Sequence, residues 1–123
     1  MEVETFARWA EIDASPEVLA SLRSDWTIHP LKITGIEVAA ACMSGSEIHF
    51  AIAPEWRRRV ISRLRTREFL APLFEVHGFL TTRTAPDKMR YHFLERIGFV
   101  LTWNDGVNNH YFMHKLPFGL KEN

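Results

Sequence analysis

The sequence predicts a single α+β domain over residues 1–123, on three observations. The chain has 123 residues, enough for one hydrophobic core and too few for two ordinary domains. Hydrophobic residues make up 46% of it, so a packed core forms easily. From residue 36 onward, strand-like and helix-like patterns alternate in the order β-β-α-β-α-β-β. This order predicts a mixed, mostly antiparallel sheet flanked by helices.

The amino-terminal third begins with residues 3–12, which read equally as a short strand or a helix start. Ser15-Pro16-Glu17 predicts a helix start, because serine caps well, proline fits the first helical position and an acid favours the first turn. We expect this helix to end near Asp25. Pro30 and Gly35 then indicate a connection without regular structure.

A hairpin is predicted next. Residues 36–43 read as a strand, and Ser44-Gly45-Ser46 as a tight turn into residues 47–53. In this second strand apolar residues alternate with small or ionisable ones, so the two sets occupy opposite faces. Ile48, Phe50 and Ile52 form one face, and Glu47, His49, Ala51 and Ala53 form the other.

A helical period follows from Trp56 to about Val76. Pro72 is expected to kink or interrupt this helix, because proline lacks the backbone donor. Gly78 ends it, and residues 79–84 predict a short strand.

The remaining elements are a helix and a hairpin. The helix opens at Ala85-Pro86-Asp87 and ends at Gly98. Residues 99–103 and 110–113 predict two strands. The connection at 104–109 contains Asp-Gly and Asn-Asn, which tolerate positive φ, so a hairpin is expected.

Composition argues against several classes of partner. Fifteen Lys and Arg balance fifteen Asp and Glu, so no net charge favours nucleic acid or an anionic membrane. No apolar run approaches a membrane span, and the first residues lack the pattern of a signal peptide. Cys42 is the only cysteine, which fits a reducing compartment. We therefore expect a soluble cytoplasmic protein, in a bacterium or in an infected host cell.

Other polar clusters favour structural interpretations. The arginines between residues 57 and 67 indicate a solvated helix face rather than a nucleic-acid patch. His110 and His114 share a strand face but lack a third ligand, so no metal site is predicted. Cys42 lies in an apolar strand and is expected to be a buried small hydrophobe.

Two segments carry a family resemblance. Residues 47–54 followed by Glu55-Trp56-Arg57 look like a central strand that leads into a pyrophosphate loop. Residues 87–99 end in Glu-Arg-Ile-Gly-Phe, a helix-to-strand signature. From Ser46 to about Lys115 the chain thus resembles the GNAT superfamily of N-acyltransferases. The resemblance implies the GNAT fold, acetyl-CoA as cofactor and an amine as acceptor substrate.

The cofactor loop departs from the family pattern of Arg or Gln, two residues, Gly, one residue, and Gly or Ala. Arg57 matches the first position, whereas Val60 and Ser62 replace the small residues that let amides approach the pyrophosphate. Valine hinders that approach, and three arginines favour it, so functional acetyl-CoA binding and weak or absent binding both stay open. The resemblance assigns these cofactor contacts: Ile52, Arg57, Arg58, Arg59, Val60, Ile61, Ser62 and Asp87.

The catalytic groups also differ from the family. Its usual general acid is a tyrosine four residues before the Gly of the Gly-Phe pair, and here Leu94 holds that position and cannot donate a proton. The resemblance makes Glu47 the best base candidate. His49 shares its strand face, and imidazole titrates near neutrality. Tyr91 and His92 are alternative acids at positions that do not match the family.

Two functions remain open. The first is an acyl-CoA-dependent N-acetyltransferase with an atypical, degenerate cofactor site. The alternative is a non-catalytic phage head-assembly or virion-associated protein that retains the fold and binds a phage structural protein. Small phage proteins resemble compact GNAT domains with eroded loops, and the small size and Asn-Asp-Gly hairpin here are similar.

Overall fold

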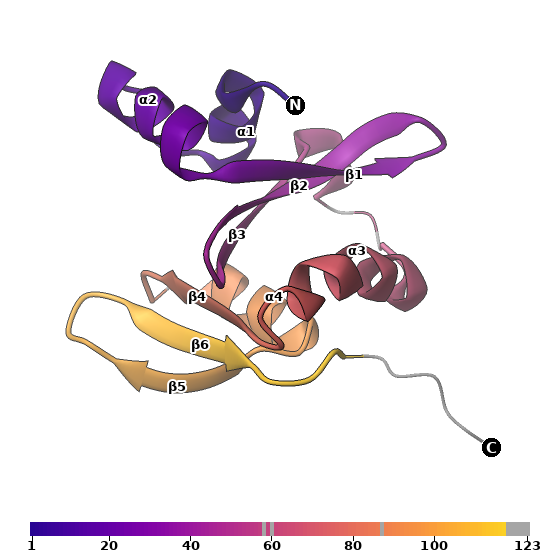
Figure 1. Ribbon diagram of the computed structural model, residues 1–123, viewed down its shortest axis with the longest axis vertical. Helices are drawn as coiled ribbons and strands as arrows, with labels where there is room; N and C mark the ends of the chain where they lie inside the picture. The colour runs from indigo at the N-terminus through magenta and orange to yellow at the C-terminus, as the bar shows by residue number, and fades with distance from the viewer. Residues whose placement is uncertain (58, 60, 87, 118–123) are drawn as a thin grey trace. The chain divides into compact units, whose positions relative to one another are not determined.

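The computed structural model describes residues 1–57, 59, 61–86 and 88–117, with the backbone alone for residues 88–91. The backbone divides into two compact units, Met1–Val60 and Ile61–Asn123 (Figure 1). The single domain expected over residues 1–123 stays a prediction. In the part of the chain that is described, no helix has the length and apolar character needed to cross a membrane.

The first unit packs two helices on a three-stranded antiparallel sheet (Figure 1). The ambiguous segment 3–12 is helical, and Ser15 caps the second helix as predicted, accepting a hydrogen bond from the Val18 amide at 3.3 Å. The middle strand, β2, pairs with β1 and β3. The elements are α1 (Val3–Ala10), α2 (Pro16–Asp25), β1 (Thr27–Ile33), β2 (Ile36–Ser44), β3 (Glu47–Ile52) and one 3₁₀ turn, Pro54–Trp56.

The connection expected around Pro30 is instead strand β1. Pro30 pairs with Ala40 of β2, and β1 has no second partner among the described residues of its unit. An edge strand tolerates proline because one row of its backbone groups needs no partner. Gly35 makes the turn into β2 with φ of 81°, a conformation that glycine adopts without strain.

The core of the first unit lies between its helices and one face of its sheet. Ala40, Cys42 and Ala51 supply the sheet side, and Phe6 and Ala7 of α1 are buried against them. Small strand residues allow this close approach. Because Ala51 is two and four residues from His49 and Glu47, all three share the face that carries the helices.

The second unit contains an antiparallel sheet in which β6 lies between β4 and β5. Its helices bury Leu70, Leu73, Leu94 and Ile97. Gly98 ends α4 with φ of 107°, and a Cβ there would lie 2.7 Å from the Pro117 side chain. The elements are α3 (Arg63–Glu75), β4 (Leu80–Thr84), α4 (Lys88–Arg96), β5 (Val100–Asn104) and β6 (Asn109–Met113). The predicted order of elements from residue 36 is confirmed.

Two predictions about the long helix are wrong. It begins at Arg63 and not at Trp56, because Pro54 starts a separate 3₁₀ turn and Ser62 provides the N-cap. Pro72 does not interrupt it, since α3 continues to Glu75. One proline removes a single helical hydrogen bond, and burial of the neighbouring Leu70 and Leu73 offsets that loss.

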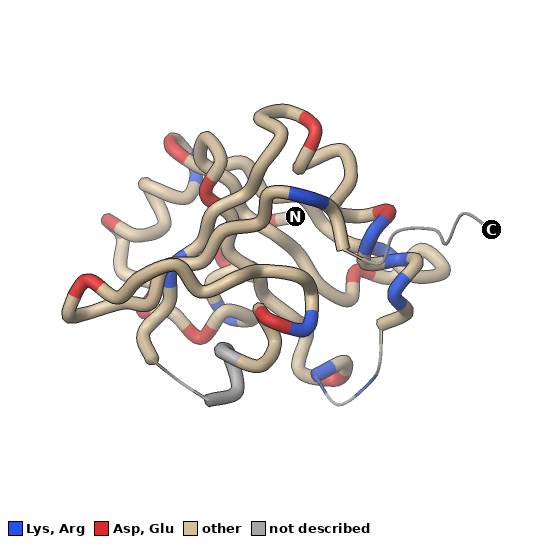
Figure 2. The backbone as a smooth tube through the Cα atoms, turned by 90° about the horizontal axis from the view of Figure 1, so that it is seen from below, with Lys and Arg blue, Asp and Glu red and all other residues tan. Residues whose placement is uncertain are grey.

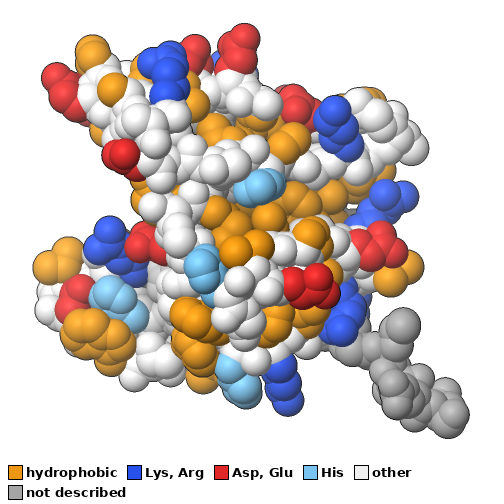
Figure 3. Space-filling model, viewed as in Figure 1, with side chains coloured by type: hydrophobic (Ala, Val, Ile, Leu, Met, Phe, Trp, Pro, Cys, Tyr) orange, Lys and Arg blue, Asp and Glu red, His pale blue; other side chains and the backbone are white. Residues whose placement is uncertain are grey.

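Charged and apolar groups both reach the surface. Lys and Arg segments are interspersed with Asp and Glu segments along the backbone, in keeping with the balanced sequence (Figure 2). Hydrophobic side chains gather over the β5–β6 hairpin (Figure 3). Val100, Trp103 and Val107 there are more than half exposed.

Candidate active site

Glu47 and His49 form a close polar pair on β3. The His49 Nε2 and Glu47 Oε2 atoms lie 2.6 Å apart, a short distance typical of a charge-assisted hydrogen bond. The side chains are 34% and 28% exposed for His49 and Glu47 respectively, so the pair is partly shielded but open to a ligand. The two-residue period that placed both residues on one face therefore also brings them into contact.

Trp26 completes this cluster, and the sequence alone did not predict its contact with His49. It is the C-cap residue of α2, just before β1, and its ring lies edge-on to the His49 ring at 5.5 Å between centroids. The contact follows from strand register, because Ile28 pairs with Cys42 and Cys42 pairs with His49. Without β1 in the prediction, nothing in the sequence could place Trp26 near His49.

The geometry gives the imidazole a defined role. An ionised carboxylate only accepts hydrogen bonds, so in a neutral His49 the Nε2 atom carries the hydrogen and donates the bond to Glu47. The lone pair then lies on Nδ1. Such an arrangement, a histidine oriented by a carboxylate, is suited to general base chemistry. In such an arrangement the carboxylate would also stabilise the imidazolium that forms when the other nitrogen accepts a proton.

Cys42 lies beside the pair, but its thiol is unreactive at neutral pH. It is cross-strand neighbour to His49 and is 3% exposed. Burial, with a further contribution from the Glu47 charge, raises the pKa of the Cys42 thiol to about 12. The thiol therefore stays protonated at neutral pH and is a poor nucleophile. The prediction of a buried small hydrophobe is confirmed.

Arg57, the residue that matches the family loop, has three hydrogen bonds within the first unit. Its Nε donates to the Ile52 carbonyl at 3.3 Å, its Nη1 to the Glu11 carboxylate at 2.8 Å and its Nη2 to the Trp9 carbonyl at 2.8 Å. Two of the predicted cofactor residues, Ile52 and Arg57, are thus joined to each other. The guanidinium group already has protein partners, and its role toward a cofactor stays a prediction.

The other loop residues are divided between the units. Arg59 lies over the Trp56 ring at 4.8 Å, a cation–π contact. Ile61 and Ser62 precede α3 in the second unit. The predictions for Arg58, Val60 and Asp87 fall outside the described residues.

The start of α3 has the chemistry of an anion site. Ser62 caps the helix by accepting from the Arg65 amide at 3.2 Å, and the first turn contains no acidic residue. Arg63 and Arg65 add positive charge where the helix dipole is also positive. The donor set at this helix start therefore fits the phosphate groups of acetyl-CoA.

The α4 helix supplies no acid at the family's tyrosine position. Leu94 is 5% exposed and lies in the core of the second unit. His92 is exposed on the same helix, and the side chain of Tyr91 lies outside the described part. Their use as alternative acids stays a prediction.

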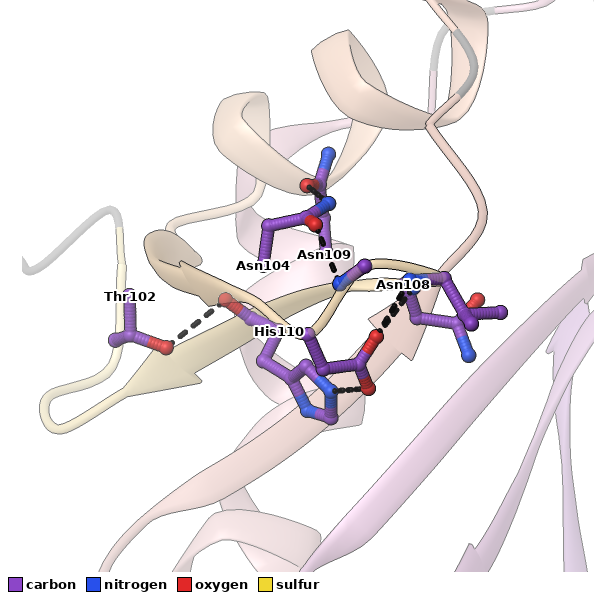
Figure 4. A network of polar contacts seen from close by, with 8 residues as sticks. Thr102, Asn104, Asn108, Asn109 and His110 are labelled. Carbon is purple, nitrogen blue, oxygen red and sulfur yellow. Dashed lines mark hydrogen bonds and ion pairs between the residues drawn. The ribbon is translucent and has the colours of Figure 1, made fainter.

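His110 belongs to a turn network rather than to a metal site. Its Nε2 lies 2.7 Å from Asp105 Oδ2 (Figure 4). Its ring also stacks on the Trp103 ring, with 4.4 Å between the centroids. Asp105 also accepts from the Asn108 and Val107 amides, and these bonds hold the pKa of its carboxyl well below the usual range. Among the described residues, no group of three His, Cys, Asp or Glu could hold a metal ion.

Comparison with known proteins places the fold. No protein-family model and no curated protein matches the sequence. Solved structures do match. An IAA acetyltransferase from Bacillus cereus ATCC 14579 has a TM-score of 0.63 at 12% identity, over 92% of this chain and 95% of that one. A GNAT family acetyltransferase from Elizabethkingia anophelis with acetyl-CoA bound has a TM-score of 0.60 at 10% identity, over 85% and 86%.

A third match is a spermidine N-acetyltransferase SpeG chimera from Vibrio cholerae and hSSAT, with a TM-score of 0.63 at 11% identity, over 91% and 88%. The chain has the GNAT fold. The predicted α+β class, with a mixed, mostly antiparallel sheet flanked by helices, is confirmed. At 10–12% sequence identity these matches show the fold alone. Any chemical activity has to be argued from the residues of this chain.

Proposed function

We propose that this protein is an acyl-CoA-dependent N-acyltransferase in which His49, oriented by Glu47, is the base. The observation that carries the proposal is the 2.6 Å contact between the two side chains on β3. The GNAT fold supports it, since structures of that fold include acetyltransferases. The acceptor would be an amine, and a polyamine is a reasonable first choice because a spermidine N-acetyltransferase chimera is among the matches.

The proposed reaction forms a C–N bond, breaks a C–S bond and moves one proton from the amine to His49. Acetyl-CoA, when bound, supplies a thioester carbon that forms the new C–N bond and a C–S bond that breaks. His49 accepts at Nδ1 the proton that the amine nitrogen loses, and Glu47 stabilises the resulting imidazolium. The CoA sulfur leaves as a thiolate and takes its proton from solvent, since a leucine at residue 94 has none to donate, so turnover is expected to be slow. In the second unit, taken by itself, Arg63, Arg65 and the α3 N-terminus have the chemistry to bind phosphate groups.

The test is the rate of free thiol release from acetyl-CoA, measured with spermidine, other amines and lysine peptides. His49→Ala should lower turnover by about 100- to 10,000-fold, the usual contribution of a general base. Glu47→Gln should also lower it, because the amide cannot stabilise an imidazolium. Neither change should alter acetyl-CoA affinity much, since neither residue belongs to the proposed phosphate site.

His29→Ala is the matched control. His29 is on β1 and pairs with Ala41, so it lies on the opposite sheet face from Cys42 and His49. Its removal should leave turnover unchanged. Activity that survives Glu47→Gln and His49→Ala together would reject the pair as the base.

The non-catalytic alternative makes a different prediction. A phage head-assembly or virion-associated protein would release no thiol with any acceptor and would be found in purified virions. The residues at 60 and 62 are the sequence feature that keeps this alternative open, because they replace the family's small loop residues. We favour the enzyme because Glu47 and His49 are in hydrogen-bond contact at 2.6 Å on β3.

A further inference from the structure

Arg57 connects three separate parts of the first unit. Its three hydrogen bonds reach the end of α1 at Trp9, the C-cap residue Glu11 and the end of β3 at Ile52. All three guanidinium nitrogens are engaged. A lysine could not reproduce this pattern, because its ammonium group is a single donor centre without the planar fork of arginine.

The C-terminal end of α1 requires such a partner. The last four carbonyls of a helix lack intrahelical donors, and here the Glu11 amide serves Ala7 and Arg8. The Trp9 carbonyl receives its hydrogen bond from Arg57. A guanidinium at this position also complements the negative end of the helix dipole.

Through α1, this contact is connected to the Glu47–His49 pair. Helix α1 buries Phe6 and Ala7 against the face of β3 that carries the pair. Leu22 of α2 is buried in the same cluster as Phe6 and Ala7, and Trp26 packs against that cluster. Helix α2 ends at Trp26, the residue whose ring touches His49.

We infer that Arg57 is a positioning residue: it fixes the end of α1 to the end of β3 and thereby holds the helices, and Trp26 with them, against His49. The inference rests on the proposed function for its effect on turnover. It assigns to Arg57 a structural use of its side chain that differs from binding cofactor phosphate. A phosphate that took this guanidinium would have to compete with the Glu11 carboxylate.

Two variants separate these roles. Arg57→Lys keeps the charge and loses the fork, and Glu11→Gln removes the competing carboxylate while keeping a hydrogen-bond acceptor. For a positioning residue, both should lower turnover, by about 10- to 100-fold for Arg57→Lys and by less for Glu11→Gln. The calorimetric Kd for acetyl-CoA should change by less than about two-fold, as expected when no ligand contact is lost.

A second readout does not depend on activity. The Trp26 ring current acts on the His49 ring, so the NMR resonance of the His49 ring protons should move toward the free-histidine position in Arg57→Lys. Arg23→Gln is the control, because that exposed arginine contacts the exposed Glu4 carboxylate and lies outside the buried cluster of Phe6, Ala7 and Leu22. It should leave the resonance in place. If the native protein shows no turnover, the proposed function fails while this resonance still tests Arg57.

Two results would overturn the inference that Arg57 is a positioning residue. If Arg57→Lys weakens acetyl-CoA binding ten-fold or more and Glu11→Gln strengthens it, Arg57 is a phosphate ligand held back by Glu11, and the inference is overturned. An unmoved His49 resonance in both variants also overturns it. Should Arg57→Lys fail to fold, Glu11→Gln gives the same resonance test with the arginine intact.

Discussion

Replacement of Ser62 by alanine should separate a structural role from a cofactor role at the start of α3. The hydroxyl accepts from the Arg65 amide at 3.2 Å, while the Ser62 carbonyl accepts the first regular helical bond, from the Thr66 amide at 3.0 Å. Alanine keeps the second bond and loses the first. Loss of a serine N-cap costs about 1 kcal/mol of unfolding free energy, within a range of about 0.5–2 kcal/mol.

For a chain of 123 residues, about 1 kcal/mol corresponds to a fall in Tm of roughly 3–6 °C. Circular dichroism during heating and urea titration would measure it. Ser62→Gly should cost only a few tenths of a kcal/mol, because glycine is itself an acceptable N-cap. Acetyl-CoA affinity should not fall in either variant, since the family has Gly or Ala at this loop position.

Two further serines serve as comparisons. Ser15→Ala removes the equivalent cap of α2 and should cost about as much as Ser62→Ala. Ser24→Ala removes an exposed hydroxyl that donates to the Ala20 carbonyl, and its effect should stay within about 0.5 kcal/mol. If Ser62→Ala is as stable as the native protein while Ser15→Ala is not, the cap at α3 is not formed. If Ser62→Gly is as costly as Ser62→Ala, capping is not the cause.

Three other predictions concern titration and packing. Because the pKa of Asp105 is lowered in the folded protein, its ionised carboxylate stabilises the fold above the unfolded pKa of about 4. This stabilisation is lost as the pH falls further, so the free energy of unfolding of Asp105→Asn should depend less on pH in acid than that of the native protein. The Cys42 thiol, with its pKa raised to about 12, should react slowly with an aromatic disulfide reagent at pH 8 and quickly after unfolding in urea. Leu94→Tyr should lower stability by about 1–3 kcal/mol through overpacking and give no gain in turnover, which a melting curve and the thiol assay would check.

The sequence predicts correctly those elements whose signals lie in residues close together in the chain. Ser15 and Pro16 start α2 as expected, and the alternation in residues 47–53 places Glu47 and His49 on one face. These features depend on residues close together in the chain. Strand β1 was missed because Pro30 argues locally for a connection, whereas pairing with β2 stabilises a strand there.

The start of α3 shows a second limit. The arginines after Trp56 continue a helical pattern, and nothing local distinguishes a helix from a turn and a new N-cap. The family loop pattern presents Ser62 only as a replacement for Gly or Ala. Its hydroxyl caps the helix in the structure, so the same side chain that departs from the family loop has a structural reason to be there.

The contacts around the candidate site depend on residues far apart in sequence. Arg57 meets Glu11 across 46 positions, and Trp26 meets His49 across two strand pairings. A single sequence records neither relation. Residue type and strand face could therefore suggest the base, whereas the groups that orient it required the structure.

The most direct test of the account follows the acetyl group itself. Acetyl-CoA labelled with ¹³C at the carbonyl would be mixed with spermidine, a second amine or a lysine peptide, and the carbonyl resonance followed by NMR. The account predicts that the thioester signal is replaced by an amide signal with the native protein, and that His49→Ala slows this by about 100-fold or more. A thioester signal that persists with every amine, or an amide signal that forms equally fast with His49→Ala, would contradict it.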